Sequence, residues 1–153
     1  MAARQVTAFS PRHWVERALS AERAGNADLA LAEMESALAA YPKDAALAND
    51  AGSLAQRLGQ YALAETRFAA ALALAPTNPE FAINRAIALT ALEKPREAAA
   101  FLCTFESAAG RIARYWSVRA NAERSAGMVA EAGRSYERCL TLEPNHPRAL
   151  HGR

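Results

Sequence analysis

The strongest constraint on the fold of this chain is a helix-breaking residue that returns every 34 residues. Pro42 and Pro76 lie 34 residues apart, and Pro144 follows after two further periods, with Gly110 at the intermediate place. Proline inside a helix removes a backbone donor and clashes with the preceding turn, so each of these prolines ends a helix. The chain therefore divides without gaps into four units, which are residues 11–44, 45–78, 79–112 and 113–146.

Signals for helix starts recur in the same register, counted here as positions 1 to 34 within each unit. Position 34 carries a side chain that can cap a helix N-terminus in Ser10, Asp44 and Asn78. Position 1 is a proline, which suits the first helical turn, in Pro11, Pro79 and Pro147. Position 15 is a glycine that can end a helix in Gly25, Gly59 and Gly127. Each unit is thus predicted to be two helices of about 14 residues joined by a tight turn.

Composition agrees with an all-helical chain and names no partner. About a quarter of the residues are Ala, the best helix former. The 18 Lys and Arg nearly balance the 16 Asp and Glu, and no basic stripe is evident, so we expect no nucleic-acid and no membrane partner. Two isolated cysteines suit a reducing compartment, which predicts a cytoplasmic protein. Richness in Ala and Arg is typical of a bacterial source with a GC-rich genome.

The units resemble tetratricopeptide repeats, in which Gly, Tyr, Ala, Phe and Pro recur within 34 residues. The second unit carries the pattern in Gly52, Gly59, Tyr61, Ala64, Phe68, Ala71 and Pro76. The first unit carries it in Trp14, Gly25, Ala30, Met34, Ala37 and Pro42, and the fourth in Trp116, Gly127, Ala132, Tyr136 and Pro144. The third unit is degenerate, with Phe105 in place of a small residue and Gly110 in place of proline.

This resemblance implies an all-α fold, a right-handed α-solenoid of antiparallel helix pairs with about eight helices and the start of a ninth. Residues 1–10 are then an N-terminal extension, residues 11–146 the repeat domain, and residues 147–153 the start of a fifth repeat or a capping helix. We expect the third unit to contact the fourth more loosely or at a different angle than its neighbours do.

No pattern of catalytic, cofactor-binding or metal-binding residues emerges. The histidines His13, His146 and His151 fall in different parts of the repeat array, and no HExxH motif or cysteine pair is present. Cys139 occupies a small core position, which favours an inert buried thiol. The sequence therefore predicts no cofactor and a protein that is not an enzyme, unless a catalytic domain follows residue 153.

The candidate site is a peptide-binding groove on one face of each first helix. Positions 4, 8 and 11 are predicted to face the core, so positions 2, 5, 9 and 12 share another face. In tetratricopeptide repeats that face lines the concave groove. The groove residues are predicted to be Arg12, Val15, Leu19, Asn49, Ser53, Gln56, Ile83, Ile87, Thr90, Arg114, Ser117, Asn121 and Arg124.

Within this groove Asn49, Asn121 and Arg124 are predicted to bind a peptide backbone, and Ile83 and Ile87 to supply an apolar strip for one anchoring side chain. The alternative is that all of these residues are simply solvated helix faces.

A known version of the groove, the carboxylate clamp that holds chaperone tails, does not fit. It needs Lys, Asn, Asn, Lys and Arg at set positions of three successive units. Read from the first unit these positions hold Val15, Leu19, Asp50, Glu80 and Asn84, and from the second Asn49, Ser53, Asn84, Arg114 and Val118. Neither set has the required residue types at these positions, so binding of chaperone tails is not expected.

Position 7 is arginine in Arg17, Arg85, Arg119 and, if the register continues, Arg153. Such a row suggests either a ladder for an acidic or phosphorylated partner or arginines that lie along the core and pair locally. Local pairing, such as Arg119 with Glu123 one turn later, is the favoured interpretation.

Three function classes remain open. The first is a non-catalytic scaffold that binds a peptide or partner helix. The second is the N-terminal module of a longer bacterial enzyme of the sulfotransferase or glycosyltransferase type. The third, an RNA-binding repeat, is weakest because the groove lacks basic and aromatic surface.

The helix predicted at residues 147–153 is too short to cover Val129, Tyr136 and Leu140. We therefore expect either a longer polypeptide or a homodimer through the C-terminal end.

Overall fold

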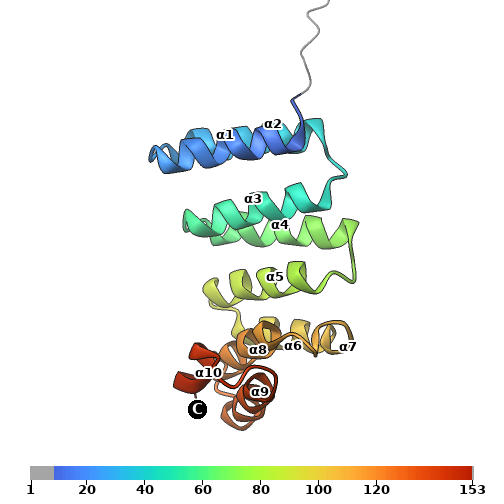
Figure 1. Ribbon diagram of the computed structural model, residues 1–153, viewed down its shortest axis with the longest axis vertical. Coiled ribbons are helices and arrows are strands. Elements are labelled where there is room, and N and C mark those ends of the chain that lie inside the picture. Colours follow the sequence, from blue (N-terminus) through green and yellow to red (C-terminus); the bar gives the residue numbers. More distant parts are fainter. Residues whose placement is uncertain (1–8, 153) are drawn as a thin grey trace, which may run out of the picture.

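The computed structural model describes residues 9–152, and this part of the chain is helical throughout, with no strand. The helices follow one another in a single stack (Figure 1). Their bounds are α1 Pro11–Arg23, α2 Ala27–Ala40, α3 Ala45–Arg57, α4 Tyr61–Leu74, α5 Pro79–Ala91, α6 Pro95–Cys103, α7 Glu106–Ala109, α8 Ala113–Ser125, α9 Val129–Leu142 and α10 Pro147–Gly152. Within residues 9–152 no helix is long and apolar enough to cross a membrane. The predictions for residues 1–8 and Arg153 lie outside the described part.

The predicted caps form at three of the helix starts. Ser10 accepts from the backbone N–H of His13, and Asp44 from that of Leu47. Asn78 accepts from two backbone N–H groups at the start of α5. Each satisfies a donor that the first helical turn leaves free. Asn26 caps α2 in the same way, which the repeat pattern did not indicate.

The turns inside the units show why glycine recurs there. Gly25, Gly59 and Gly127 have φ values of 77°, 75° and 78°, in the left-handed region that glycine reaches without strain. The third unit has Glu93 at this position, with φ of 60°. This conformation costs a residue with a Cβ about 1–2 kcal/mol of conformational energy, so the turn is strained.

Small residues let the two helices of a unit approach each other. Gly52 of α3 lies against Phe68 of α4, where a Cβ on Gly52 would come within 2.6 Å of the ring. Ala64 opposite is fully buried, and Phe68 is 1% exposed. The large ring thus fills the space that the two small residues leave, as the repeat pattern predicts.

The third unit departs from the pattern more than expected. Its second helix is not one element of about 14 residues, because α6 ends at Cys103 and a separate short helix, α7, begins at Glu106. Phe105 lies in the break and packs against Phe101, with ring centroids 5.1 Å apart. The prediction of a single second helix in this unit is therefore wrong.

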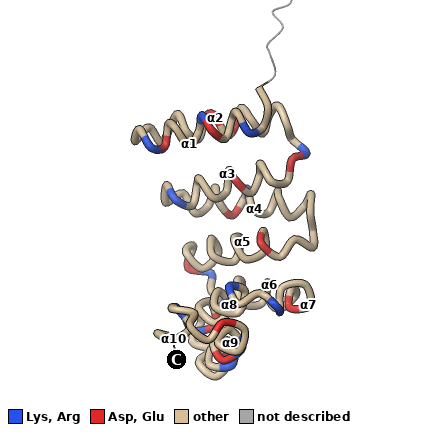
Figure 2. Tube along the Cα trace, in the orientation of Figure 1, with Lys and Arg blue, Asp and Glu red and all other residues tan. Residues whose placement is uncertain are grey.

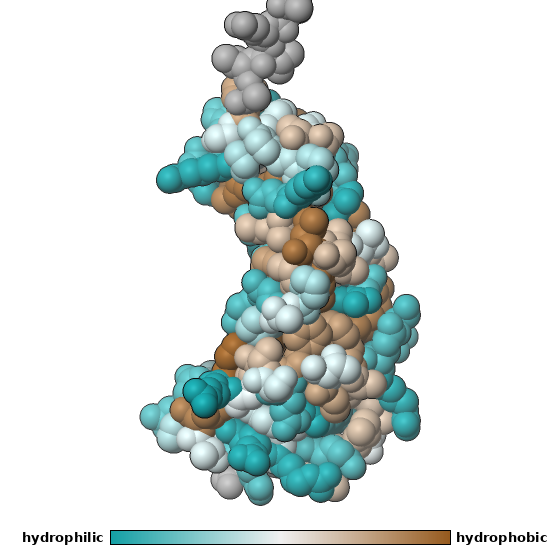
Figure 3. Space-filling view, turned by 90° about the vertical axis from the view of Figure 1, so that its right-hand side faces the viewer, coloured by the Kyte–Doolittle hydropathy of each residue, from teal (hydrophilic) through white to brown (hydrophobic). Residues whose placement is uncertain are grey.

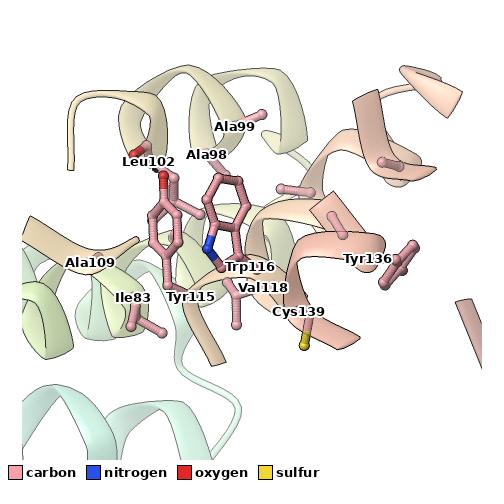
Figure 4. Close-up of a cluster of buried hydrophobic side chains, with 14 of the residues drawn as sticks. Ile83, Ala98, Ala99, Leu102, Ala109, Tyr115, Trp116, Val118, Tyr136 and Cys139 are labelled. Atoms are coloured by element: carbon pink, nitrogen blue, oxygen red, sulfur yellow. Dashed lines mark hydrogen bonds between the residues drawn. The ribbon is translucent and has the colours of Figure 1, made fainter. Parts of the chain in front are cut away.

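Two aromatic side chains of the fourth unit donate hydrogen bonds to carbonyls on either side of this break. The hydroxyl of Tyr115 donates to the carbonyl of Leu102 at 2.8 Å, and the indole of Trp116 donates to the carbonyl of Gly110 at 2.8 Å. Both carbonyls lie at helix ends, where the backbone ladder of the helix stops; that of Leu102 also accepts from the backbone N–H of Phe105 at 2.9 Å. Figure 4 shows both rings beside α6 and α7 within the core cluster.

The stack also turns at this place. In Figure 1, α1 to α5 lie across the view, whereas α9 is seen nearly end-on. α8 packs against both α5 and α6, while α1 and α3 barely touch. The expected change of angle between the third and fourth units is therefore present.

The C-terminal helix covers more of α9 than its length suggested. α10 packs on α8 and α9, and Ala149 is fully buried. Gly152 lies so close to Tyr136 that a Cβ would meet the ring at 2.3 Å, and Tyr136 is only 2% exposed. The expectation that Tyr136 stays partly bare is wrong, whereas Val129 is exposed as expected.

Cys139 is buried, and burial raises the pKa of its thiol, as expected for an inert side chain.

Candidate functional site: the inner groove

The first helix of each unit lies on the inside of the curve. α1 touches α3, α3 touches α5, and α5 packs on α8. Among the described residues, the second helices α2, α4 and α6 contact one another less than these first helices do. Figure 3 shows the molecule in profile, hollowed on one side. The positions predicted to line a groove therefore stand on the helices that form the inner face.

A pocket of about 220 Å³ lies on this face between α1 and α3. Its floor is apolar, because Ala18, Met34 and Leu54 are buried there. Half-buried Val15 and Leu19 form its wall. The remaining lining residues are Asp50, Ser53 and Arg57.

Three predicted groove residues, Val15, Leu19 and Ser53, thus come together at this pocket. The sequence interpretation missed Asp50 and Arg57, which stand at positions 6 and 13. Both positions are one residue beyond the predicted face, and a face about one residue wider would have included them.

One side of the pocket is closed by an ion pair between the first two units. Arg57 donates to both carboxylate oxygens of Glu22, at 2.8 and 2.9 Å. This hydrogen bonding lowers the pKa of Glu22 and raises that of Arg57. The charge of Arg57 is therefore already matched within the chain.

Asp50 differs from these neighbours, because it makes no ion pair with the described residues. Partial burial at the pocket raises the pKa of its carboxyl group, and the nearby carboxylate of Asp44 raises it further. Asp50 also lines a second hollow of about 220 Å³, together with Val15, Asp44 and Leu47. An unmatched carboxylate thus stands where two hollows of the groove meet.

Farther along the inner face, polar side chains join three successive units. The amide of Asn84 on α5 donates to the side-chain oxygen of Asn49 on α3 at 2.9 Å. Arg114 on α8 donates to Asn84 at 2.9 Å and to Glu80 at 2.7 Å. The predicted residues Asn49 and Arg114 therefore belong to one polar row, and Asn84 and Glu80 complete it.

Asn121 and Arg124 continue along α8. Both are exposed, and Arg124 donates to Asn121 at 3.1 Å. Figure 2 shows acidic and basic residues distributed along the whole stack, with no face of a single sign.

Other predicted groove residues lie elsewhere. Ile83 is fully buried and Ser117 is 4% exposed, so neither side chain reaches the groove, and their placement in its lining is wrong. Ile87 packs partly against the same core cluster. The predicted apolar strip on the third unit is therefore mostly core, and the apolar surface of the groove lies between the first two units instead.

The remaining predicted positions are partly occupied by contacts within the chain. The hydroxyl of Thr90 donates to the carbonyl of Ala86 at 2.9 Å. Arg12 is exposed and pairs with Glu16 one turn later at 3.0 Å. Gln56 is half-buried.

The position-7 arginines pair locally, as the sequence favoured. Arg17 contacts Glu33 at 2.6 Å, and Arg85 contacts Glu65 at 2.8 Å. Each guanidinium also lies over an aromatic ring, with Arg85 4.9 Å from the ring centre of Phe101. These arginines do not form a free ladder for an acidic partner.

The third member of this row, Arg119, has the most enclosed surroundings. It pairs with Glu123 at 2.9 Å and Glu106 at 2.6 Å, and Ser135 donates to Glu123 at 2.7 Å. Burial opposes the charge of Arg119, but its hydrogen bonds to Glu106, Glu123 and Tyr115 outweigh this and raise its pKa.

Residues 9–152 contain no group of three or more His, Cys, Asp or Glu side chains that could hold a metal ion.

Comparisons with known proteins agree with this geometry. Residues 113–146 match the family model described as tetratricopeptide repeat. No curated protein sequence matches the chain. Among solved structures, the first such domain of Spaghetti (RPAP3), bound to the HSP90 peptide SRMEEVD, is 27% identical with a TM-score of 0.67. That similarity covers 70% of this chain and 85% of the other.

Two further structures share the fold over more of the chain. MamA 41-end from Desulfovibrio magneticus RS-1 is 18% identical with a TM-score of 0.78, covering 91% of this chain and 78% of that one. YrrB, described as a TPR protein with an unusual peptide-binding site, is 20% identical with a TM-score of 0.72, covering 94% and 74%. Residues 113–146 thus match the tetratricopeptide repeat family, and the chain as a whole has the fold of proteins built from such repeats.

Proposed function

We propose that this protein is an interaction scaffold that binds an extended peptide segment in its inner groove. The observation that carries the proposal is the apolar pocket between α1 and α3, which opens on the same face as the polar row from Asn49 to Arg114. The peptide-bound domain of RPAP3 and the description of YrrB support this use of the fold.

The size and chemistry of the pocket suit a peptide side chain. At about 220 Å³ it is smaller than the roughly 300–1,000 Å³ typical of small-molecule sites. An apolar side chain that leaves water here gains about 25 cal/mol per Å² of buried apolar surface. The amides of Asn49 and Asn121 both donate and accept, so they can bond a peptide backbone without selecting its side chains.

The groove does not suit the peptide that RPAP3 binds. SRMEEVD carries three acidic residues. In this chain Asp50 and Glu80 stand where the chaperone-tail clamp has other residue types, and like charges repel. We therefore expect SRMEEVD to bind this protein weakly or not at all.

The finer predictions about the setting of this scaffold stay predictions. They are that the protein comes from a bacterium, that it lies in the cytoplasm, that it has no nucleic-acid partner, and that it forms a homodimer through its C-terminal end. The exposed side chains Val129, Leu142 and Leu150 at that end would favour self-association, which light scattering over a range of concentrations measures.

The proposed function is tested by blocking the groove. Peptides that bind the purified chain are selected from a phage-displayed library of random 12-residue sequences. Their affinity is then measured for Ser53→Trp, which fills the pocket, and for Ser36→Trp, which places the same ring on exposed surface of α2. We expect Ser53→Trp to weaken binding at least tenfold and Ser36→Trp to leave it unchanged. Equal affinities for both variants would contradict the proposal.

A further inference from the structure

The charges around the pocket between α1 and α3 are matched except at one place. Arg57 is held by Glu22, and Arg12 by Glu16. Asp44 caps α3 by accepting from Leu47 at 2.9 Å. Asp50 makes neither an ion pair nor a hydrogen bond with the described residues, so its carboxylate is free to meet a ligand.

Asp50 also lies beside the apolar floor of the pocket. It belongs to the lining of the 220 Å³ pocket, beside Leu54 and Ser53, and to the lining of the adjoining hollow, beside Asp44. A peptide that places an apolar side chain on Leu54 and Met34 therefore brings its neighbouring side chains to Asp50. In an extended peptide, alternate side chains point to the same face, about 6–7 Å apart.

The surroundings of Asp50 favour a positive charge. Its carboxylate is partly withdrawn from water, which raises its pKa, and Asp44 adds a second negative charge nearby; the positive charge of Arg57 acts in the opposite direction, but it is already paired with Glu22. A Lys or Arg side chain placed there would restore to the carboxylate the hydrogen bonds that it lost with water. A negatively charged side chain would meet two carboxylates at a site with less water than the open surface.

We infer that the groove takes a peptide with an apolar anchor for the pocket between α1 and α3 and a Lys or Arg side chain next to it that pairs with Asp50. This inference rests on the proposed function and names the chemistry of the partner. The partner is therefore a basic, partly apolar segment, which is the opposite of an acidic tail.

The test uses peptides selected from the random 12-residue library. The strongest binder is compared with a version in which every Lys and Arg is replaced by Gln. Both are measured on the natural chain, on Asp50→Asn, and on Asp28→Asn, which removes the same charge from an exposed place on α2. Circular dichroism checks that each variant is folded.

We expect the selected peptides to carry a Lys or Arg within two residues of an apolar side chain. Replacement by Gln and the change Asp50→Asn should each weaken binding about tenfold, and the two together should weaken it little more than either alone. Asp28→Asn should have no effect. Asp50→Lys should reverse the preference, so that a Glu version of the peptide binds better than the Lys version.

The outcomes separate this inference from the proposed function. If Ser53→Trp blocks binding but Asp50→Asn does not change it, the groove binds peptides and the inference is wrong. If the selected peptides are acidic, it is wrong as well. If Ser53→Trp has no effect on any selected peptide, both proposals fail. If the chain forms dimers that Ser53→Trp abolishes, the occupant is a second copy, and the inference fails.

Discussion

The junction between the first and second units and the junction between the third and fourth are built on the same repeat but differ in packing. At the first, α1 and α3 barely touch, a pocket lies between them, and two ion pairs, Arg57 with Glu22 and Arg67 with Glu35, span the units. At the second, α8 packs closely on α5 and α6 around Tyr115 and Trp116 (Figure 4).

The difference follows from two positions at the start of the first helix. Positions 3 and 4 are Leu47 and Ala48 in the second unit, and Tyr115 and Trp116 in the fourth. Two aromatic rings fill the later junction and hold the broken helix of the third unit, whereas the smaller pair brings less volume to the earlier one. One repeat pattern thus gives either a closed structural joint or an open one that offers a binding pocket.

The largest expected effect is on the closed junction. Tyr115→Ala removes a fully buried ring and its bond to Leu102, which should cost about 3–5 kcal/mol of unfolding free energy. Val15→Ala at the open junction should cost only about 1 kcal/mol, because that side chain is half-exposed. Urea unfolding of both variants measures the difference, and equal costs would show that the two junctions are not distinct.

A second comparison uses one carboxylate from each junction. Glu123 is 2% exposed and accepts from Arg119 and Ser135, so Glu123→Gln should cost about 1–3 kcal/mol because it disrupts buried, charge-assisted hydrogen bonds, although Arg119 keeps its pair with Glu106. Glu22→Gln breaks a more exposed pair and should cost less than about 1 kcal/mol. Thermal unfolding at low and high salt tests this, since added salt should shrink the effect of Glu22→Gln much more.

A third change relieves strain in the degenerate third unit. Glu93→Gly restores the glycine of the other turns at φ of 60° and should stabilise the protein by about 1 kcal/mol. Gln60→Gly, placed just after a turn that already contains Gly59, is the control and should not stabilise. A loss of stability in Glu93→Gly would show that the Glu93 side chain contributes more than its backbone costs.

The smallest expected effect concerns Asp50 at the open junction. Because burial and Asp44 raise its pKa in the folded state, its ionised form destabilises the fold at pH values above that pKa. Well below its unfolded pKa the group is protonated in both states and this penalty is absent. Asp50→Asn should therefore raise the melting temperature slightly at pH 7 and less as the pH falls. An NMR titration that finds the Asp50 pKa at or below its ordinary value would refute this.

The period, the caps and the small core residues were readable from the sequence because each depends on local geometry. Pro42 and Pro76 stop helices, and Gly25 and Gly59 turn the chain, wherever they stand. The break between α6 and α7 was not readable from the residues of the third unit, and the structure shows a residue of the next unit at this place, where the hydroxyl of Tyr115 donates to the carbonyl of Leu102.

The groove was predicted only in part for the same reason. Helical periodicity identifies the inner face and so finds Val15, Leu19 and Ser53. It does not give the angle between neighbouring units, and that angle buries Ile83 and Ser117 where α5 meets α8. It also does not show that the exposed side chain of Asp50 lies at the edge of a pocket. Which face a helix presents is local, whereas how deeply each residue is buried depends on the neighbouring unit.

The account depends most on the open junction being the place where a peptide binds. The direct measurement is methyl NMR of the chain labelled at Leu and Val, with a saturating library-selected peptide. The account predicts intermolecular NOEs from an apolar peptide side chain to the methyl groups of Val15 and Leu19. It predicts none to the exposed Leu29 and Leu74 on α2 and α4. NOEs confined to Leu29, Leu74 or Val129 would contradict it, because the peptide would then lie outside the groove.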